Sequence, residues 1–245
     1  MRKFLKSDKK ILILSRKIDI KLLKLKTAIL RKIFPSRKTF QTKNLAENGK
    51  LDLEEYTRAQ TEGNKRKIDY IFETEENVKM LSDYLLKNFE GIKFGLCHGT
   101  RQGKEQEWFN KYLNAEVLGT EISDTAADFP NTIQWDFHNV KEEWIGNVDF
   151  IYSNAIDHSY DARYCLKQWF RCLRKGGVCV LNGTTNNTPW STTKIDLFGY
   201  TKEGLKSLVN ELSVEYNIKI EKVFEGKDLA KKGFSEWFYF IIRKS

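Results

Sequence analysis

The sequence predicts an α/β fold, in which a doubly wound, mostly parallel sheet ends in an antiparallel C-terminal hairpin. Two observations predict it. Between residues 93 and 213 short apolar runs alternate with helical segments, a pattern typical of parallel strands joined by right-handed crossovers. Two more strand-like runs, 216–224 and 236–242, follow without a clear helix between them, so we expect them to pair as a hairpin.

The individual elements follow from apolar periodicity and from punctuation by glycine. The region 51–90 predicts helices, one of which opens at Glu75 with an apolar stripe behind it. The glycine pair Gly176-Gly177 precedes the fifth strand. The remaining predicted strands and helices, in chain order, are strand 93–98, helix 104–113, strand 115–121, strand 132–136, strand 148–153, helix 161–174, strand 178–182 and helix 202–213.

Positive charge is concentrated at the N-terminus. The formal net charge is +9, yet residues 1–43 hold 15 Lys or Arg against only Asp8 and Asp19. The rest of the chain is therefore mildly acidic, and the overall basicity does not by itself indicate a nucleic-acid substrate. We expect residues 1–45 to form a basic helical segment with a linker, and residues 46–245 to form one Rossmann-like domain.

Residues 10–34 predict an amphipathic basic helix. Its apolar residues recur every three or four positions, Lys and Arg cover most of the remaining surface, and Pro35 ends it. Three roles stay open: contact with the domain or a second subunit, attachment to an anionic membrane surface, and, least favoured, binding of nucleic acid. Residues 36–50 are polar and predict a linker.

The four cysteines show no C-x-x-C pair and no metal-like spacing with the three histidines, so the sequence predicts no metal site. Reduced, buried thiols are typical of a cytosolic protein. No uncharged apolar run is long enough for a membrane span, and the N-terminus makes a poor secretory signal. We therefore expect a cytoplasmic protein, with residues 10–34 as its only candidate for membrane contact.

The candidate ligand site lies where the first three predicted strands end. A glycine-bearing turn, Gly99 to Gly103, follows the first strand; the second closes on Glu121 and the third on Asp136. Glycine lets the backbone approach a ligand closely, and a carboxylate at a strand end can accept both hydroxyls of a ribose. The layout predicts a nucleotide-type site at the carboxyl edge of the sheet.

Over about residues 51–245 this order of motifs resembles the class I S-adenosylmethionine-dependent methyltransferases. The resemblance implies S-adenosylmethionine as the cofactor. In that family the turn after the first strand contacts the methionine part of the cofactor, which assigns this role to His98, Gly99, Thr100 and Gly103. The acid of the second strand, Glu121, would bind the ribose, and Asp136 with its neighbour Phe137 would flank the adenine. The reaction site would lie at the end of the fourth strand, at Asn154.

The turn departs from the family pattern, because Leu96 to Gly103 lacks the usual acid and the close G-x-G-x-G spacing. A dehydrogenase would also use a glycine turn and a ribose acid, but its pyrophosphate favours a tighter G-x-G-x-x-G. Ahead of the first strand, Tyr56, Gln60 and Asn64 lie near one helical face and could cap the pocket.

His158 is the candidate catalytic residue, since an imidazole can take a proton from a hydroxyl during methyl transfer. Asp157 or Asp161 could orient it. Asn154 is not followed by the Pro-Pro-aromatic pattern expected for methylation of exocyclic or amide nitrogens, which favours oxygen. The polar loop 183–190 follows the fifth strand and could bind a sugar-like acceptor.

We therefore expect methyl transfer, by in-line displacement, to the oxygen of a small-molecule or glycan-linked acceptor. Two alternatives remain: an RNA methyltransferase whose basic arm holds the nucleic acid, and a non-catalytic scaffold that keeps the cofactor fold.

Overall fold

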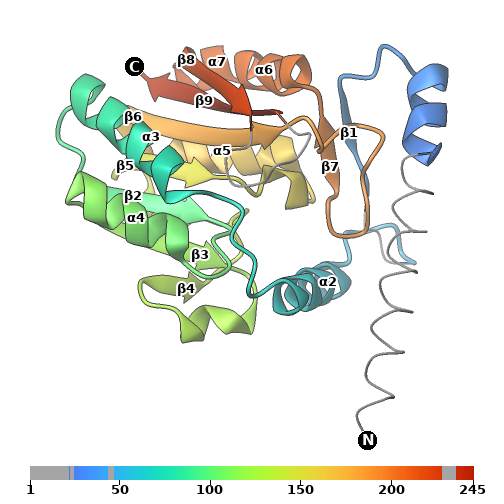
Figure 1. Ribbon diagram of the computed structural model, residues 1–245, viewed down its shortest axis with the longest axis horizontal. Helices are drawn as coiled ribbons and strands as arrows, with labels where there is room; N and C mark the ends of the chain where they lie inside the picture. Colours follow the sequence, from blue (N-terminus) through green and yellow to red (C-terminus); the bar gives the residue numbers. More distant parts are fainter. Residues whose placement is uncertain (1–21, 23–24, 44–46, 228–235) are drawn as a thin grey trace, which may run out of the picture.

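The computed structural model describes residues 22, 25–43, 47–227 and 236–245. A seven-stranded sheet lies at its centre (Figure 1), in the order β4-β3-β2-β5-β6-β9-β8. β9 pairs antiparallel with both of its neighbours, β6 and β8, and the other pairs of the sheet are parallel. The predicted α/β fold with a C-terminal hairpin is thus confirmed. The strands are β2 (Phe94–His98), β3 (Glu116–Glu121), β4 (Thr132–Gln134), β5 (Val148–Ser153), β6 (Leu173–Thr184), β8 (Ile218–Lys227) and β9 (Glu236–Lys244).

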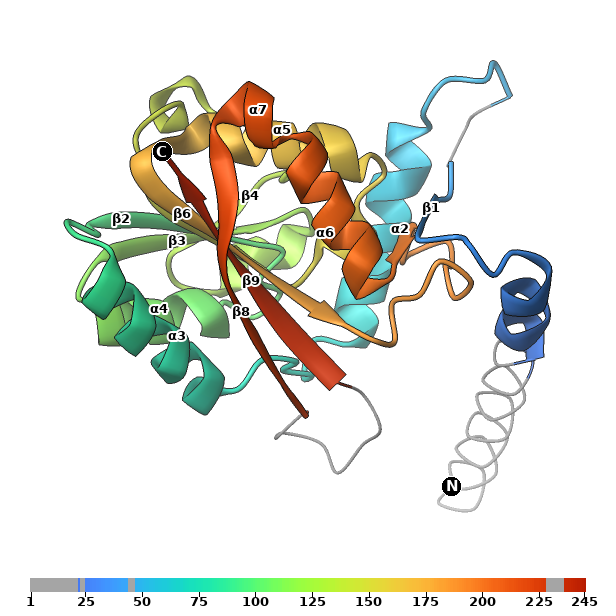
Figure 2. The ribbon, with the colours of Figure 1, turned by 90° about the horizontal axis from the view of Figure 1, so that it is seen from above.

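Helices cover both faces of the sheet (Figure 2). On one face lie α3 (Glu75–Asn88) and α4 (Lys104–Leu113), and on the other lie α5 (Ala162–Cys172), α6 (Lys202–Glu211) and α7 (Ser213–Tyr216). The helix α2 (Leu53–Arg66) lies beyond one end of the strands. Because successive side chains of a strand point to opposite faces, each strand supplies both cores.

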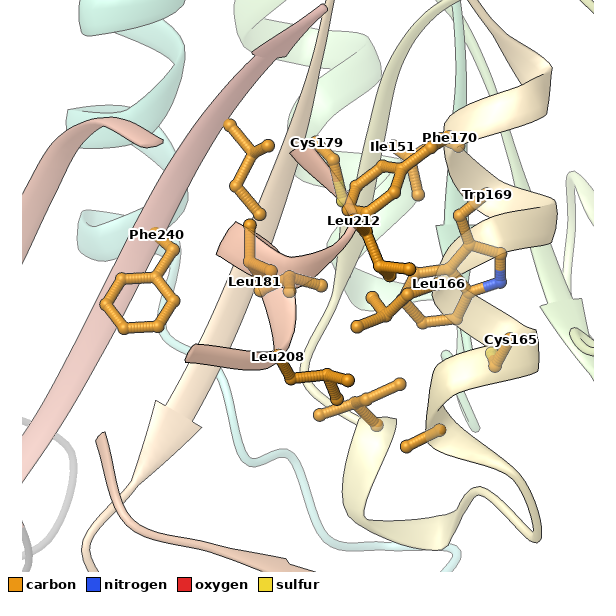
Figure 3. Close-up of a cluster of buried hydrophobic side chains, with 14 of the residues drawn as sticks. Ile151, Cys165, Leu166, Trp169, Phe170, Cys179, Leu181, Leu208, Leu212 and Phe240 are labelled. Atoms are coloured by element: carbon orange, nitrogen blue, oxygen red, sulfur yellow. The ribbon is translucent and has the colours of Figure 1, made fainter. Parts of the chain in front are cut away.

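The two cores show this alternation in β5. Ile151 belongs to the core under α5, where it lies in one cluster with Trp169 and Leu166 (Figure 3). Its neighbour Tyr152 belongs to the core under α3 and α4, together with Phe109. The middle of the sheet is therefore buried on both sides.

One strand begins earlier than the sequence indicates. The fifth predicted strand starts at residue 178, whereas β6 starts at Leu173 and runs through the glycine pair. The register between β5 and β6 shifts at this point, and a Cβ on Gly177 would lie 2.9 Å from the carbonyl oxygen of Arg174. The glycines therefore allow an irregularity within a strand and are not a turn before it.

The polar segment predicted as a linker contains a strand, β1 (Thr39–Gln41). It pairs antiparallel with β7 (Phe198–Tyr200) as a separate two-stranded sheet. The Gln41 side chain also accepts from the backbone N–H of Ala162 (3.2 Å) and donates to the Ser159 carbonyl (2.9 Å). The domain boundary at residue 45 stays a prediction, but residues 39–41 are joined to the domain.

Of the predicted basic helix 10–34, the structure describes residues 22 and 25–34, and residues 25–33 are helical. Residues 10–21, 23 and 24 lie outside the described residues. Apolar side chains of the described part are about half exposed, among them Leu25, Ile29 and Ile33. Thr27 donates to the Trp190 carbonyl (3.2 Å). Among the described helices, none has the length and apolar character needed to cross a membrane.

Candidate active site

Two adjoining cavities open at the carboxyl ends of the parallel strands. The large cavity measures about 360 Å³ and the small cavity about 50 Å³. Residues that line both of them are Lys67, Gly99, Arg101, Ala155 and His158. The predicted nucleotide-type site therefore coincides with a real depression, which continues from one cavity into the other.

The turn after β2 is held by the neighbouring strand. The backbone N–H groups of Gly99 and Thr100 both donate to the Thr120 carbonyl, at 2.8 and 3.2 Å. Gly99 has a φ of +76°, and a Cβ there would lie 2.4 Å from the Ala155 methyl carbon. Only glycine combines this dihedral with this close approach.

The end of the turn is equally constrained. Gly103, at φ +71°, precedes the first residue of α4, and Arg101 itself has a φ of +46°. The Arg101 guanidinium donates to the Tyr70 carbonyl (2.9 Å) and lies over the Phe72 ring (4.9 Å to the centroid). Gln102 donates to the Ile68 carbonyl. The turn thereby binds the segment between α2 and α3.

Glu121, at the end of β3, is buried and lines the small cavity. Its carboxylate accepts from the backbone N–H groups of Arg101 and Ser123, both at 3.0 Å. One bond falls on each oxygen, so each oxygen keeps acceptor capacity for a hydroxyl. The side chain thus ties the glycine turn to the end of the next strand and can still accept from a ligand.

Asp136 and Phe137 line the same small cavity as Glu121. The Asp136 carboxylate accepts from the backbone N–H of His138 (3.0 Å) and lies 2.6 Å from its Nδ1. The other ring nitrogen of His138 lies 2.7 Å from the Ser159 hydroxyl, and the ring stacks on Tyr160. Asp136 is therefore fixed by His138, a partner that sequence reasoning missed.

His98 lies apart from the cavities. The residue is 2% exposed and does not line either cavity. Its ring stacks on Trp169, with 4.8 Å between the centroids, and its Nδ1 lies 2.9 Å from the Thr120 hydroxyl. Burial lowers the pKa of His98 to about 3, so the ring is neutral at physiological pH. It packs in the core beneath the turn, and its side chain does not face the proposed ligand.

Asn154 lines the large cavity and donates to Glu105 (3.2 Å). Glu105 is in the first turn of α4, and burial raises its pKa to about 7. Sequence reasoning missed Glu105, because an acid in the first turn of a helix is ordinarily explained by the helix dipole alone.

His158 lies in the 3-10 helix η3 (Ile156–His158) and lines both cavities. Its Nδ1 is 3.2 Å from the Ile195 carbonyl and 3.3 Å from a carboxylate oxygen of Asp196. Asp157 is adjacent and lines the large cavity. Asp161, the alternative orienting residue, instead caps α5 by accepting from the backbone N–H of Tyr164 (2.9 Å). Asp196 is the acid beside the imidazole nitrogen.

The floor of the large cavity contains a second carboxylate network, centred on buried Glu73. One oxygen accepts from the hydroxyls of Tyr152 (2.5 Å) and Tyr239 (2.8 Å) and from the Asn182 amide (3.0 Å). The other accepts from the Thr74 backbone N–H (2.9 Å) and the Asn77 amide (3.0 Å). No sequence signal marks this network, because its members come from four separate segments: residues 73–77, β5, β6 and β9.

Three residues of α2 cover the small cavity, as the sequence predicted. Tyr56, Gln60 and Asn64 are buried and line it. The Tyr56 hydroxyl donates to the His158 carbonyl (3.3 Å) and Gln60 donates to the Ile195 carbonyl (2.8 Å). The helix α2 is thus bonded to the same segments that carry His158 and its neighbours.

Comparison with solved structures supports this fold. The chain has the fold of the class I S-adenosylmethionine-dependent methyltransferases, which is found in many matching structures. One is the Burkholderia thailandensis 1,6-didemethyltoxoflavin-N1-methyltransferase, with bound 1,6-didemethyltoxoflavin and S-adenosylhomocysteine. Its TM-score is 0.58 at 9% identity, over 79% of this chain and 88% of that one.

Two further structures show the range of chemistry named for this fold. The Streptomyces coelicolor A3(2) geranyl diphosphate C-methyltransferase, in complex with Mg²⁺, geranyl diphosphate and S-adenosylhomocysteine, has a TM-score of 0.51 at 10% identity, over 69% of this chain and 81% of that one. The [4+2]-cyclase SpnF has a TM-score of 0.52 at 11% identity, over 68% and 80%. No family model and no curated protein matches the chain.

Proposed function

We propose that this protein is an S-adenosylmethionine-dependent methyltransferase acting on the oxygen of a small-molecule or glycan-linked acceptor. One observation carries the proposal: Glu121 and Asp136, at the ends of neighbouring strands, line one cavity beside a glycine turn that admits close backbone approach. The fold shared with structures that bind S-adenosylhomocysteine supports the same cofactor.

The nucleoside half of the cofactor would occupy the small cavity, with its ribose hydroxyls on Glu121 and its adenine beside Asp136 and Phe137. At about 50 Å³ this cavity is too narrow for a whole nucleoside. A bound nucleoside would therefore require the lining residues to move apart, or would extend into the adjoining large cavity. The methionine half would pass Gly99 and Thr100 toward Gly103, Asn154 and the large cavity.

The acceptor would occupy the large cavity, whose walls include amide and hydroxyl groups suited to a polyhydroxylated molecule. The end of β6 and the loop after it contribute several of them, namely Thr184, Asn186 and Asn187. An acceptor oxygen attacks the methyl carbon in line with the sulfur; the new C–O bond forms while the C–S bond breaks and sulfur keeps the electron pair. Alignment supplies much of the acceleration, because the sulfonium is already an activated donor.

The acceptor hydroxyl must also lose its proton, and His158 is placed to take it. If Nδ1–H donates to the Ile195 carbonyl, the lone pair at Nε2 is available as the base. Asp157 and Asp196 would stabilise the resulting imidazolium.

Calorimetry with S-adenosylhomocysteine, followed by methyl transfer from labelled S-adenosylmethionine to a panel of sugars and glycosides, tests the proposal. We expect saturable cofactor binding and label in one hydroxyl class. His158→Gln should lower the rate of transfer far more than it lowers cofactor affinity. No heat at high micromolar ligand would favour the scaffold alternative, and label in RNA alone would favour the RNA methyltransferase. The cyclase neighbour makes this measurement necessary, since one fold carries different reactions.

A further inference from the structure

Three potential metal ligands meet in the large cavity. Asp157, His158 and Asp196 each offer one ligand atom, two carboxylate oxygens and one imidazole nitrogen, and these atoms lie within 4.8 Å of one another. All three residues line the large cavity. Asp157 and His158 follow β5, whereas Asp196 comes from the loop between β6 and β7, so the sheet edge brings them together.

An independent observation singles out Asp157. Its side chain is only 7% exposed, and its Oδ1 accepts no hydrogen bond from any residue that the structure describes. A buried carboxylate oxygen without a donor is strongly destabilising unless the group is protonated or a positive charge compensates it. Burial raises the pKa of Asp157, and the Asp196 carboxylate adds to this effect, while His158 opposes it.

We propose that Asp157, His158 and Asp196 form a binding site for a divalent cation of the Mn²⁺ type. Around an ion with ligands at about 2.2 Å, neighbouring ligands are about 3 Å apart and opposite ones about 4.4 Å apart. The 3.3 Å between Nδ1 of His158 and the nearest Asp196 oxygen already fits neighbouring positions. The cluster therefore needs only a small contraction, in which a deprotonated Nδ1 exchanges its contact with the Ile195 carbonyl for the ion. Ca²⁺ and Mg²⁺ prefer oxygen ligands alone, so a set that mixes carboxylates with an imidazole favours a transition ion such as Mn²⁺.

Three protein ligands leave positions on the ion for oxygens of the acceptor. A coordinated hydroxyl is more acidic than a free one, so its proton can leave to solvent and the oxygen then attacks the methyl carbon. In this arrangement His158 is a ligand rather than the base. This catalytic consequence rests on the proposed function, whereas cation binding itself does not.

Lys67 is the rival source of positive charge for the cluster. It lines both cavities, and its charge opposes the rise in the pKa of Asp157 that burial causes. If its ammonium were the permanent partner of the cluster, a cation would have no place there. Measurement of Mn²⁺ binding decides between the two arrangements.

The experiment titrates Mn²⁺ into the full-length, chelator-treated protein and follows free Mn²⁺ by electron paramagnetic resonance. We expect one saturable site, weakened about tenfold or more by Asp196→Asn and by Asp157→Asn. Asp128→Asn, which changes an exposed acid outside the cluster, is the matched control and should bind like the wild type. Absence of saturation at millimolar Mn²⁺, or equal binding by Asp196→Asn, would overturn the inference.

Calorimetry with S-adenosylhomocysteine on the same samples separates this inference from the proposed function. Cofactor binding without Mn²⁺ binding would refute the cation site and leave the proposed function standing. Mn²⁺ binding without cofactor binding would support the cation site and refute the proposed methyltransferase function.

Discussion

Replacement of Glu121 by Gln tests the cofactor site most directly. The carboxylate accepts one backbone N–H on each oxygen, from Arg101 and Ser123. Gln keeps one acceptor oxygen and turns an NH₂ group toward the other backbone N–H. The variant therefore loses one charged hydrogen bond to the protein backbone and one to a ribose hydroxyl. A hydrogen bond to a charged group contributes about 1.5–3 kcal/mol. We therefore expect S-adenosylhomocysteine to bind roughly 10- to 100-fold more weakly.

Isothermal titration calorimetry measures this affinity, and thermal unfolding of the same samples detects any general loss of structure. Glu116→Gln is the matched control, because Glu116 begins the same strand, β3, and is exposed. We expect the control to bind like the wild type. If Glu121→Gln binds the ligand within twofold of the wild type while remaining folded, the carboxylate does not hold the ribose and the assignment of the small cavity is refuted.

Three further predictions concern stability and the N-terminus. Gly99→Ala should lower the free energy of unfolding by about 1–3 kcal/mol more than Gly146→Ala in urea titrations, because both glycines have a positive φ but no described atom lies within 4 Å of a Cβ at Gly146. Equal effects would refute the steric argument. The pKa of Glu105, about 7 in the fold against an ordinary 4.5, means that the folded protein binds the proton more tightly, so this residue's contribution to stability is lost as pH rises from 4.5 to 7. Glu105→Gln should therefore stabilise the protein at pH 8 and not at pH 4, by up to about 3 kcal/mol in urea unfolding, with exposed Glu107→Gln as the control; equal gains at both pH values would contradict it. Deletion of residues 1–36, which leaves β1 intact, should abolish salt-sensitive binding to anionic liposomes if the basic segment contacts membranes; unchanged flotation would exclude that role.

The sequence was sufficient for the order of the strands of the main sheet and for most of its helices, but not for β1 and β7. The helix 104–113 was predicted with the bounds that α4 shows, and the strand 148–153 with those of β5. Such local patterns are readable because side-chain periodicity records which faces are buried. Glycine pairs are less informative, because the same residues serve a turn or an irregular strand; this is why the start of β6 was misplaced.

The candidate site was predictable only where a residue's role depends on its position at a strand end. Glu121, Asp136 and Gly99 are of this kind, and the structure places all three on one cavity. His98 ends β2 directly before the same turn, yet its side chain lies in the core. The sequence did not reveal this, because the alternation of side chains along β2 cannot be followed into a turn.

By itself the sequence determined a doubly wound α/β domain, a glycine turn at its first strand and an acid after each of the next two strands. Only the tertiary structure decided which side chains of distant segments face one another: Glu73 with Tyr152, His138 with Ser159, and Asp196 with His158. The physical reason is that these contacts join segments far apart in the chain. Periodicity reports burial along one segment, whereas a contact between segments depends on register, loop path and packing that form only when the whole sheet assembles.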